Sequence, residues 1–139
     1  MPQAPIDHPK PRITLKRVYD PVGPDDGVRV LVDRVWPRGV GRDKLKADQW
    51  LREVAPSDQL RTWFHHDPDK WEEFKARYTA ELRAKPEITN LLLELARERG
   101  LTLLFAARDI QHNQAVALKE YLLFRANTDT KGEDDASDR

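Results

Sequence analysis

The sequence contains no cysteine, which excludes disulfide bonds, thiolate metal sites and a cysteine nucleophile. Its only serines are Ser57 and Ser137, and neither lies in the G-x-S-x-G turn of a serine hydrolase. The G-x-x-x-x-G-K-[ST] phosphate loop and the G-x-G-x-x-G dinucleotide fingerprint do not occur either. A serine hydrolase, a P-loop enzyme and a dinucleotide-binding domain are therefore unsupported, and no cofactor is assigned.

Long apolar runs are also missing from the sequence. No stretch approaches the roughly 18–20 apolar residues that a membrane span needs. The first eleven residues, MPQAPIDHPKP, lack the apolar segment of a signal peptide. We therefore expect no membrane association and a cytoplasmic location.

Charge is balanced overall but unevenly distributed. The 139 residues include 24 basic and 24 acidic side chains. Residues 126–139 are mainly acidic, and the remainder carries a mild excess of basic residues. That excess is well below the charge of a protein that coats DNA.

The two ends of the chain have little to bury. Residues 1–11 contain four prolines and are predicted to form a mobile arm. Residues 126–139 are small, polar and acidic and are predicted to form a mobile tail. Residues 12–125 are long enough for one domain with its own core.

Hydrophobic patterning predicts three strands and about five helices within that domain. The strands are expected at residues 12–19, 28–35 and 101–107. The short, turn-rich loop at residues 20–27 favours a hairpin between the first two strands, whereas the long helical connection between the second and third favours parallel pairing. The fold class is α/β, with a small mixed or parallel sheet of three or more strands covered by helices in a single layered domain. Helices are predicted at residues 44–55, after the cap Ser57, at 68–84 after Asp67, at 86–99 and at 114–125.

Charged residues follow the second and third predicted strands. If those strands are parallel, both segments leave the same edge of the sheet, where open α/β sheets bind ligands. The helix that begins near residue 112 would direct free N–H groups to the same edge, and arginines would add charge-assisted donors. The catalytic candidates are Asp33, Asp109 and His112, and the ligand-binding candidates are Arg34, Trp36, Arg38, Arg61, His66, Arg108 and Asn113.

Each of these residues also has a purely structural interpretation. Asp33 and Arg34 can pair with neighbours at a strand end. Asp109 and Asn113 can cap the following helix, and Trp36 can be a packing aromatic. Both interpretations stay open at the level of the sequence.

Adjacent histidines at 65 and 66 precede Asp67 and invite comparison with a metal site. Neighbouring residues of a helix point about 100° apart, and Asp67 is already expected to cap a helix. The spacing matches no standard set of zinc ligands. No metal site is predicted.

One long motif carries a family resemblance. The run D-G-V-R-V-L-V-D-R-V-W-P-R-G at residues 26–39, L-R-T-W-F-H-H-D-P at 60–68, and further matches at 71–82 and 112–118 resemble the YeaO-like family, within the group called domain of unknown function 488. The resemblance implies a compact α/β fold but no mechanism, substrate or cofactor. The wider group often has a Cys-His-Arg cluster after its last strand, and the loop at residues 108–114 has no cysteine. The resemblance therefore gives no support to thiol chemistry here.

The leading hypothesis is that the domain binds a small phosphate- or carboxylate-bearing ligand at this edge, with catalysis left open. Two alternatives remain. One is a nucleic-acid-associated or transcription-related protein, suggested by the basic excess and the Arg/Trp combination. The other is a protein-interaction module without a ligand. The oligomeric state is not predicted.

Overall fold

The structure is a computed structural model that describes residues 9–137, with side chains described as far as residue 128. Residues 1–8, most of the predicted N-terminal arm, lie outside the described range. In chain order the elements are β1 (Ile13–Arg17), β2 (Val28–Leu31), α1 (Arg42–Leu45), β3 (Gln49–Trp50), the 3-10 helix η1 (Arg52–Val54), α2 (Asp58–Phe64), the 3-10 helix η2 (Pro68–Lys70), α3 (Trp71–Arg83), α4 (Pro86–Glu98), β4 (Leu101–Phe105) and α5 (Gln114–Ser137).

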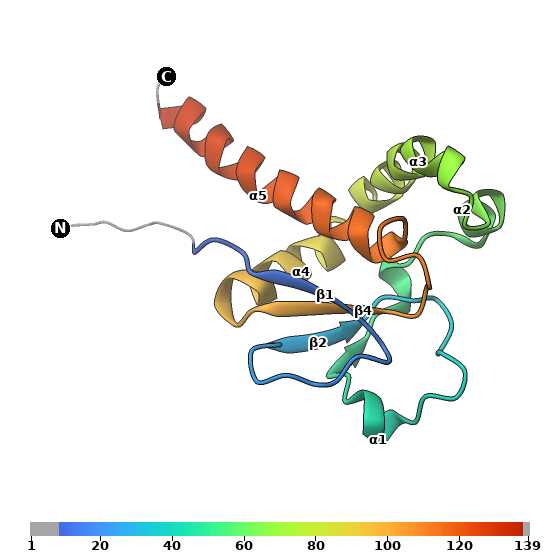
Figure 1. The fold of residues 1–139 in the computed structure, drawn as a ribbon. Helices are drawn as coiled ribbons and strands as arrows, with labels where there is room; N and C mark the ends of the chain where they lie inside the picture. The colour runs from blue at the N-terminus through green and yellow to red at the C-terminus, as the bar shows by residue number, and fades with distance from the viewer. Residues whose placement is uncertain (1–8, 138–139) are drawn as a thin grey trace.

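The four strands form one parallel sheet in the order β1-β4-β2-β3 (Figure 1). The α/β fold class is confirmed, as is the parallel pairing of β2 with β4. Since every pair is parallel, all four strands end at the same edge of the sheet. The loops that follow β2 and β4 therefore leave the sheet side by side, and this arrangement positions the candidate site.

The predicted hairpin between the first two strands is wrong. β1 and β2 do not pair with each other, because β4 lies between them and is parallel to both. The connection at residues 18–27 is too short for a helix, but an extended chain of that length reaches about 33 Å. A strand of five residues is only about 17 Å long. An irregular loop can therefore return to the start of β2, where Gly27 adopts φ +66°.

The predicted helix at residues 44–55 is also wrong. The chain instead forms the short α1, the edge strand β3 and the turn η1. Lys46, at φ +51°, ends α1. The Leu51 N–H then donates to the Leu31 carbonyl over 3.0 Å. Apolar residues at 50, 51 and 54 suited a helix, but pairing with the exposed edge of β2 determines the conformation.

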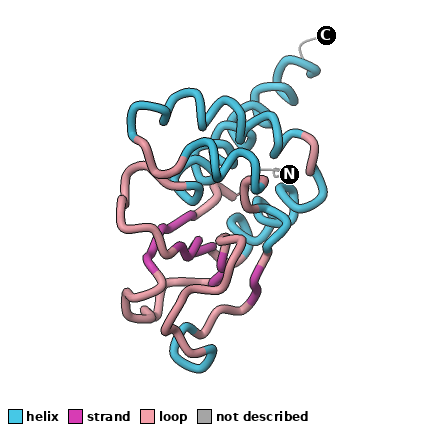
Figure 2. The backbone as a smooth tube through the Cα atoms, turned by 90° about the vertical axis from the view of Figure 1, so that its right-hand side faces the viewer, coloured by secondary structure: helices cyan, strands magenta, loops and turns pink. Residues whose placement is uncertain are grey.

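The sheet separates two hydrophobic clusters. Val28, Val30 and Leu103 belong to the larger cluster, which the helices α3, α4 and α5 complete. Leu31 and Leu104 belong to the smaller one, which the segment carrying α1 and β3 completes. Figure 2 shows helices gathered on one side of the strands and mainly loops on the other. Alternation along β2 and β4 explains this division, since successive side chains of a strand point to opposite faces.

The helix boundaries near the candidate site follow the predicted capping residues. Ser57 caps α2, because its Oγ accepts the Leu60 N–H over 3.1 Å. Glu81 of α3 accepts hydrogen bonds from both the backbone N–H and the hydroxyl of Ser57, and this fixes α2 against α3. Asp67 caps the turn before α3 as predicted, by accepting the Asp69 N–H.

The last helix differs from the prediction in length. α5 begins at Gln114 as expected but continues to Ser137, past the predicted end at residue 125. Figure 1 shows that its C-terminal part extends away from the sheet. The mobility proposed for residues 126–139 stays a prediction. Among residues 9–137, no helix combines the length and the apolar character that crossing a membrane requires.

Candidate functional site

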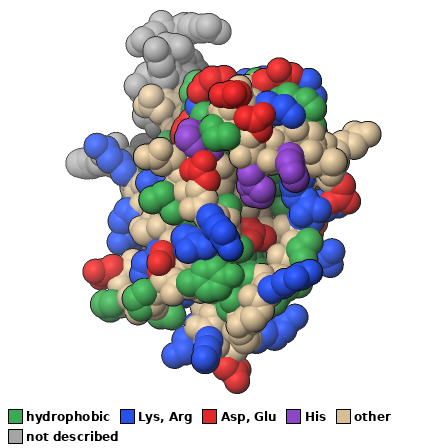
Figure 3. Space-filling model, turned by 45° about the vertical axis from the view of Figure 1, so that its right-hand side comes forward, with side chains coloured by type: hydrophobic (Ala, Val, Ile, Leu, Met, Phe, Trp, Pro, Cys, Tyr) green, Lys and Arg blue, Asp and Glu red, His purple; other side chains and the backbone are tan. Residues whose placement is uncertain are grey.

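A pocket of about 640 Å³ lies at the carboxyl edge of the sheet. Its volume falls within the range of roughly 300–1,000 Å³ that is typical of small-molecule sites. In Figure 3, histidine side chains lie on one side of a hollow in the surface, and basic side chains gather on the other. The loop after β2, the segment around α2, the helix α3 and the loop after β4 all line the pocket, through Asp33, Arg34, Val35, Pro56, Arg61, Phe64, His66, Phe74, Ala106, Ala107, Arg108, Asp109, Asn113 and Gln114.

Asp33 joins the two strand-end loops. Its Oδ2 accepts the Ala106 N–H over 3.0 Å, and its Oδ1 accepts the side-chain amide of Gln114. Its own backbone carbonyl accepts the indole N–H of Trp50 over 2.8 Å. Burial raises the pKa of Asp33 to about 6, against the opposing effects of these two hydrogen bonds and of the positive charge of Arg61. A carboxyl group that titrates close to neutrality therefore forms part of the pocket wall.

Three arginines reach the pocket from three separate segments. Arg34 follows β2, Arg61 belongs to α2, and Arg108 follows β4. The exposed carboxylate of Asp58 binds both Arg34, at 2.9 Å, and Arg61, at 3.3 Å. Arg108 makes no hydrogen bond or ion pair with any other residue in the described part of the chain. Among the three arginines, Arg108 is thus the one whose charge no acidic side chain of the described residues binds directly.

Asp109 organises the loop before α5. Its Oδ1 accepts the N–H groups of Gln111 and His112, and its Oδ2 lies 2.9 Å from Nδ1 of His112. The Gln111 N–H and the His112 side chain hold the pKa of Asp109 below its usual value. Asn113 caps α5, since its Oδ1 accepts the Val116 N–H over 3.1 Å. The capping interpretation is thus confirmed for Asn113, whereas Asp109 binds N–H groups of the loop and does not cap the helix. Its lowered pKa makes Asp109 a poor candidate for a base.

The turn after α2 has an unusual backbone. His65 and His66 adopt φ +45° and +55°. These values lie in the left-handed region of backbone conformation, which residues other than Gly rarely adopt. His65 is exposed and does not line the pocket, whereas His66 does. His65 is the left-handed C-cap of α2, and strained backbone of this kind tends to cluster at active sites and ligand clamps. The turn directs one of the two histidines to the pocket mouth.

The structure brings together seven of the predicted site residues and leaves three outside. Asp33, Arg34, Arg61, His66, Arg108, Asp109 and Asn113 line the pocket, and Trp36, Arg38 and His112 do not. Trp36 packs edge-on against Trp50 at 5.4 Å, and its indole N–H donates to the Val40 carbonyl. His112 packs edge-on against Trp71 at 5.3 Å. The packing interpretation of Trp36 is therefore the correct one.

Seven of the residues that line the pocket were not predicted as site residues, and Gln114, Phe64 and Phe74 are among them. Gln114 binds Asp33, although it was expected only to begin a helix. Phe64 and Phe74 line the pocket, although their spacing indicated core residues alone. Their rings stack with centroids 4.3 Å apart and form an apolar wall. Amphipathic spacing identifies such residues as buried but cannot show which of them border a cavity.

Ionisable residues do not gather as they would around a bound metal. Within the residues that the structure describes, no group of three or more His, Cys, Asp or Glu side chains is arranged to hold a metal ion. His65 and His66 belong to the same turn, yet only His66 faces the pocket.

Comparison with known proteins identifies relatives of the chain. A model of the family described as the inactive DUF488-N3 subclade matches residues 12–139. The uncharacterized protein YeaO of Escherichia coli strain K12 is 40% identical over 110 residues, which cover 79% of this chain and 96% of the relative. The uncharacterized protein Rv3073c of Mycobacterium tuberculosis strain H37Rv is 39% identical over 111 residues, which cover 80% and 93%. No solved structure matches significantly. The resemblance to YeaO-like proteins is thereby confirmed.

Proposed function

The chain belongs to the inactive DUF488-N3 subclade, and on that premise we propose that its pocket binds a small phosphate- or carboxylate-bearing ligand without turning it over. The observation that carries this proposal is the convergence of Arg34, Arg61 and Arg108 on one pocket from three segments distant in the sequence. Guanidinium groups are well suited to bind phosphate and carboxylate oxygens. The word "inactive" in the family description supports binding rather than catalysis.

Asp33 and the start of α5 also bear on the proposal. The first turn of α5 borders the pocket through Asn113 and Gln114, and the N-terminus of a helix favours anions. The negative charge of Asp33 opposes the binding of anions. Because its pKa is raised, Asp33 loses this charge by protonation closer to neutral pH than an ordinary aspartate does. The pocket therefore combines three arginines with two acids, and of these acids Asp33 has the charge that is more easily removed.

Titration with inorganic phosphate by isothermal calorimetry at low salt tests the proposal. The variant Arg108→Gln is expected to bind phosphate about tenfold more weakly, because a hydrogen bond to a charged group contributes about 1.5–3 kcal/mol. Arg38→Gln is the matched control, since Arg38 belongs to a neighbouring loop, is exposed and lies outside the pocket. Absence of saturable binding, or an equal loss in both variants, would contradict the proposal.

The nucleic-acid alternative has less support. Stacking on bases requires free aromatic faces, but each tryptophan already has a cation of the same chain over its ring. Arg42 lies over Trp36 and Arg52 over Trp50. Trp63 and Trp71 are covered in the same way, by Arg77 and Lys75. Neither the interaction-module alternative nor a cytoplasmic location gains a specific observation, and both stay predictions.

A further inference from the structure

The pocket has apolar surface that a bare inorganic anion leaves uncovered. Beyond the arginines, its wall includes Phe64, Phe74, Pro56 and Val35. Val35 is 59% exposed, whereas Phe64 and Phe74 stack on each other and are only 5% and 2% exposed. A small hydrated ion leaves the exposed apolar surface in contact with water, whereas an apolar group gains free energy by covering it. The wall thus favours a ligand with an apolar body attached to its anionic group.

Asp33 provides the second selective feature. Each carboxylate oxygen can accept about two hydrogen bonds, and the described residues donate one to each oxygen, from Ala106 and Gln114. Acceptor capacity is therefore left over in a group that lines the pocket. An N–H or O–H of a ligand can use this capacity, whereas a second anionic group would be repelled. Asp33 therefore favours ligands that carry a hydrogen-bond donor over ligands that do not.

We propose that the natural ligand is an organic anion that carries an apolar body and an amino or hydroxyl donor, with the anionic group at the arginines, the apolar body against the wall beside Val35, and the donor directed at Asp33. This rests on the proposed function, because it assumes that the arginines bind the anionic group. The two ideas make separate predictions, since inorganic phosphate tests the arginines alone and a ring-bearing phosphate tests the wall and Asp33.

Three probes of increasing complexity test the proposal by calorimetry with the full chain: inorganic phosphate, phenyl phosphate and 4-aminophenyl phosphate. Phenyl phosphate is expected to bind at least about tenfold more tightly than phosphate, because its ring covers apolar wall. The amino group is expected to add about another tenfold, as a hydrogen bond to a charged acceptor.

Asp33→Asn is the informative variant. The asparagine Oδ1 can accept the Ala106 N–H, and its amide can donate to Gln114 after the Gln114 amide turns over, so the loop contacts are retained. We expect the preference for the amino group to fall below about twofold, while phenyl phosphate binds equally well or more tightly because a negative charge is gone. Asp109→Asn is the matched control, because it removes a carboxylate from the same pocket whose oxygens already bind Gln111 and His112. It should keep the amino preference.

Each outcome has a definite meaning. If no probe binds, the proposed function fails and this inference fails with it. If phosphate binds but phenyl phosphate binds no more tightly, the function stands and the apolar body of the ligand is wrong. If the amino group adds nothing, or its effect survives in Asp33→Asn, the role of Asp33 is wrong.

Discussion

Acidic and basic residues lie at both ends of β2, but they are buried at its start and more exposed at its end. At its start, Asp26 and Arg29 form an ion pair whose side chains are only 7% and 5% exposed. At its end, Arg34 pairs with Asp58 at 35% and 68% exposure, beside the pocket that Asp33 lines. The first pair is enclosed and the second is open to solvent. Acidic and basic residues in one motif therefore serve structure at one end of the strand and are available for binding at the other.

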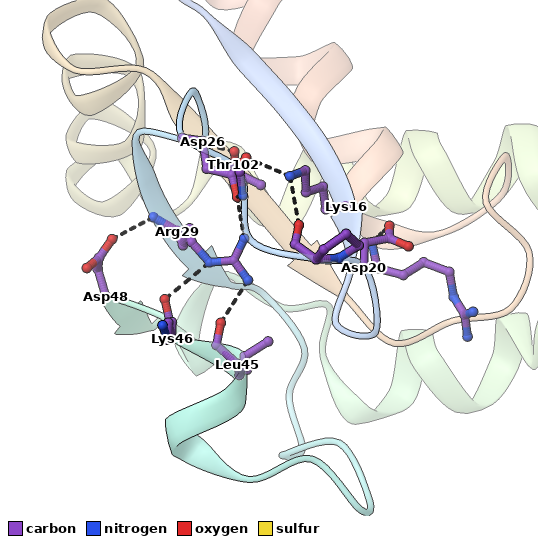
Figure 4. A network of polar contacts seen from close by, with 11 residues as sticks. Lys16, Asp20, Asp26, Arg29, Leu45, Lys46, Asp48 and Thr102 are labelled. Atoms are coloured by element: carbon purple, nitrogen blue, oxygen red, sulfur yellow. Dashed lines mark hydrogen bonds and ion pairs between the residues drawn. The ribbon is translucent and has the colours of Figure 1, made fainter.

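At the enclosed end, the Arg29 guanidinium is bonded through each of its nitrogens. Figure 4 shows the Arg29 guanidinium among Asp26 and the backbone carbonyls of Leu45 and Lys46, to which it donates over 2.7 and 3.2 Å. Asp26 also accepts the ammonium of Lys16 at 2.7 Å. Burial alone would raise the pKa of Asp26, but the hydrogen bonds from Lys16, the Gly23 N–H and Arg29 outweigh it, and the pKa is lowered. Each nitrogen of this guanidinium is bonded within the protein and its side chain is only 5% exposed, in contrast to Arg108.

The largest expected difference between the two ends is in stability. Arg29→Met leaves Asp26 without its buried partner and two carbonyls without a donor, and should lower the free energy of unfolding by about 3–5 kcal/mol. Arg34→Met breaks only a surface pair and should cost less than about 1 kcal/mol. Urea denaturation of both variants measures the difference. Equal losses would show that the two ends are not distinct.

The pH dependence of stability should have opposite signs at the two ends. Asp33 has a pKa of about 6 in the folded chain and 3.8 as its ordinary value, so the folded state holds its proton more tightly. Its contribution to stability is therefore greatest below pH 4 and is lost as the pH rises to about 6. Asp33→Asn removes this loss and should raise stability at pH 7.5 by up to about 3 kcal/mol relative to wild type, with little gain at pH 4.

Asp26, at the other end of β2, should show the opposite dependence of stability on pH. Its lowered pKa stabilises the fold when the carboxylate is charged, and this contribution disappears as the pH falls through the folded pKa. Asp26→Asn should therefore be destabilising at pH 7.5 and progressively less so in acid. Urea denaturation at a series of pH values compares both variants with wild type. Parallel curves for Asp33→Asn and wild type between pH 4 and 6 would refute the raised pKa.

Sequence patterns predicted the parts of the fold that depend on local or repetitive signals. The apolar runs in β2 and β4 are long enough to identify, and Ser57, Asp67 and Asn113 act through groups two or three residues away. The meeting of Asp33 with the loop after β4 followed from a single topological rule about parallel strands. The candidate site was therefore largely predictable once the direction of two strands was known.

The remainder depends on contacts that no local pattern encodes. β3 has two residues and exists only because β2 offers an unpaired edge. One interpretation of Arg34 was pairing with a neighbour at the strand end, but its partner Asp58 comes from α2. Trp36 and Arg38 lie outside the pocket, because the ring of Trp36 packs against Trp50 on the other face of the sheet. Motif proximity alone cannot separate such residues from true pocket residues.

The charge of Asp33 should also affect ligand affinity. Sulfate is a suitable probe because it keeps its double charge between pH 5.5 and 7.5, unlike phosphate. As Asp33 gains its proton, repulsion falls, and sulfate should bind about fivefold more tightly at pH 5.5 than at pH 7.5. Asp33→Asn should lose most of this gain. His66 also lines the pocket, so the comparison is repeated in His66→Asn, where the Asp33 effect should persist.

The smallest expected effect concerns the strained turn that borders the open end. Glycine at position 65 or 66 relieves a left-handed backbone, and each substitution should stabilise the protein by about 0.5–1 kcal/mol after the extra flexibility of glycine in the unfolded chain is counted. His65→Gly should leave sulfate affinity unchanged, because His65 lies outside the pocket. His66→Gly should bind sulfate differently from wild type, because it removes a side chain that lines the pocket. If the two variants gain stability equally and bind sulfate equally, the strain in this turn serves no binding role, and the open end of β2 depends on its arginines alone.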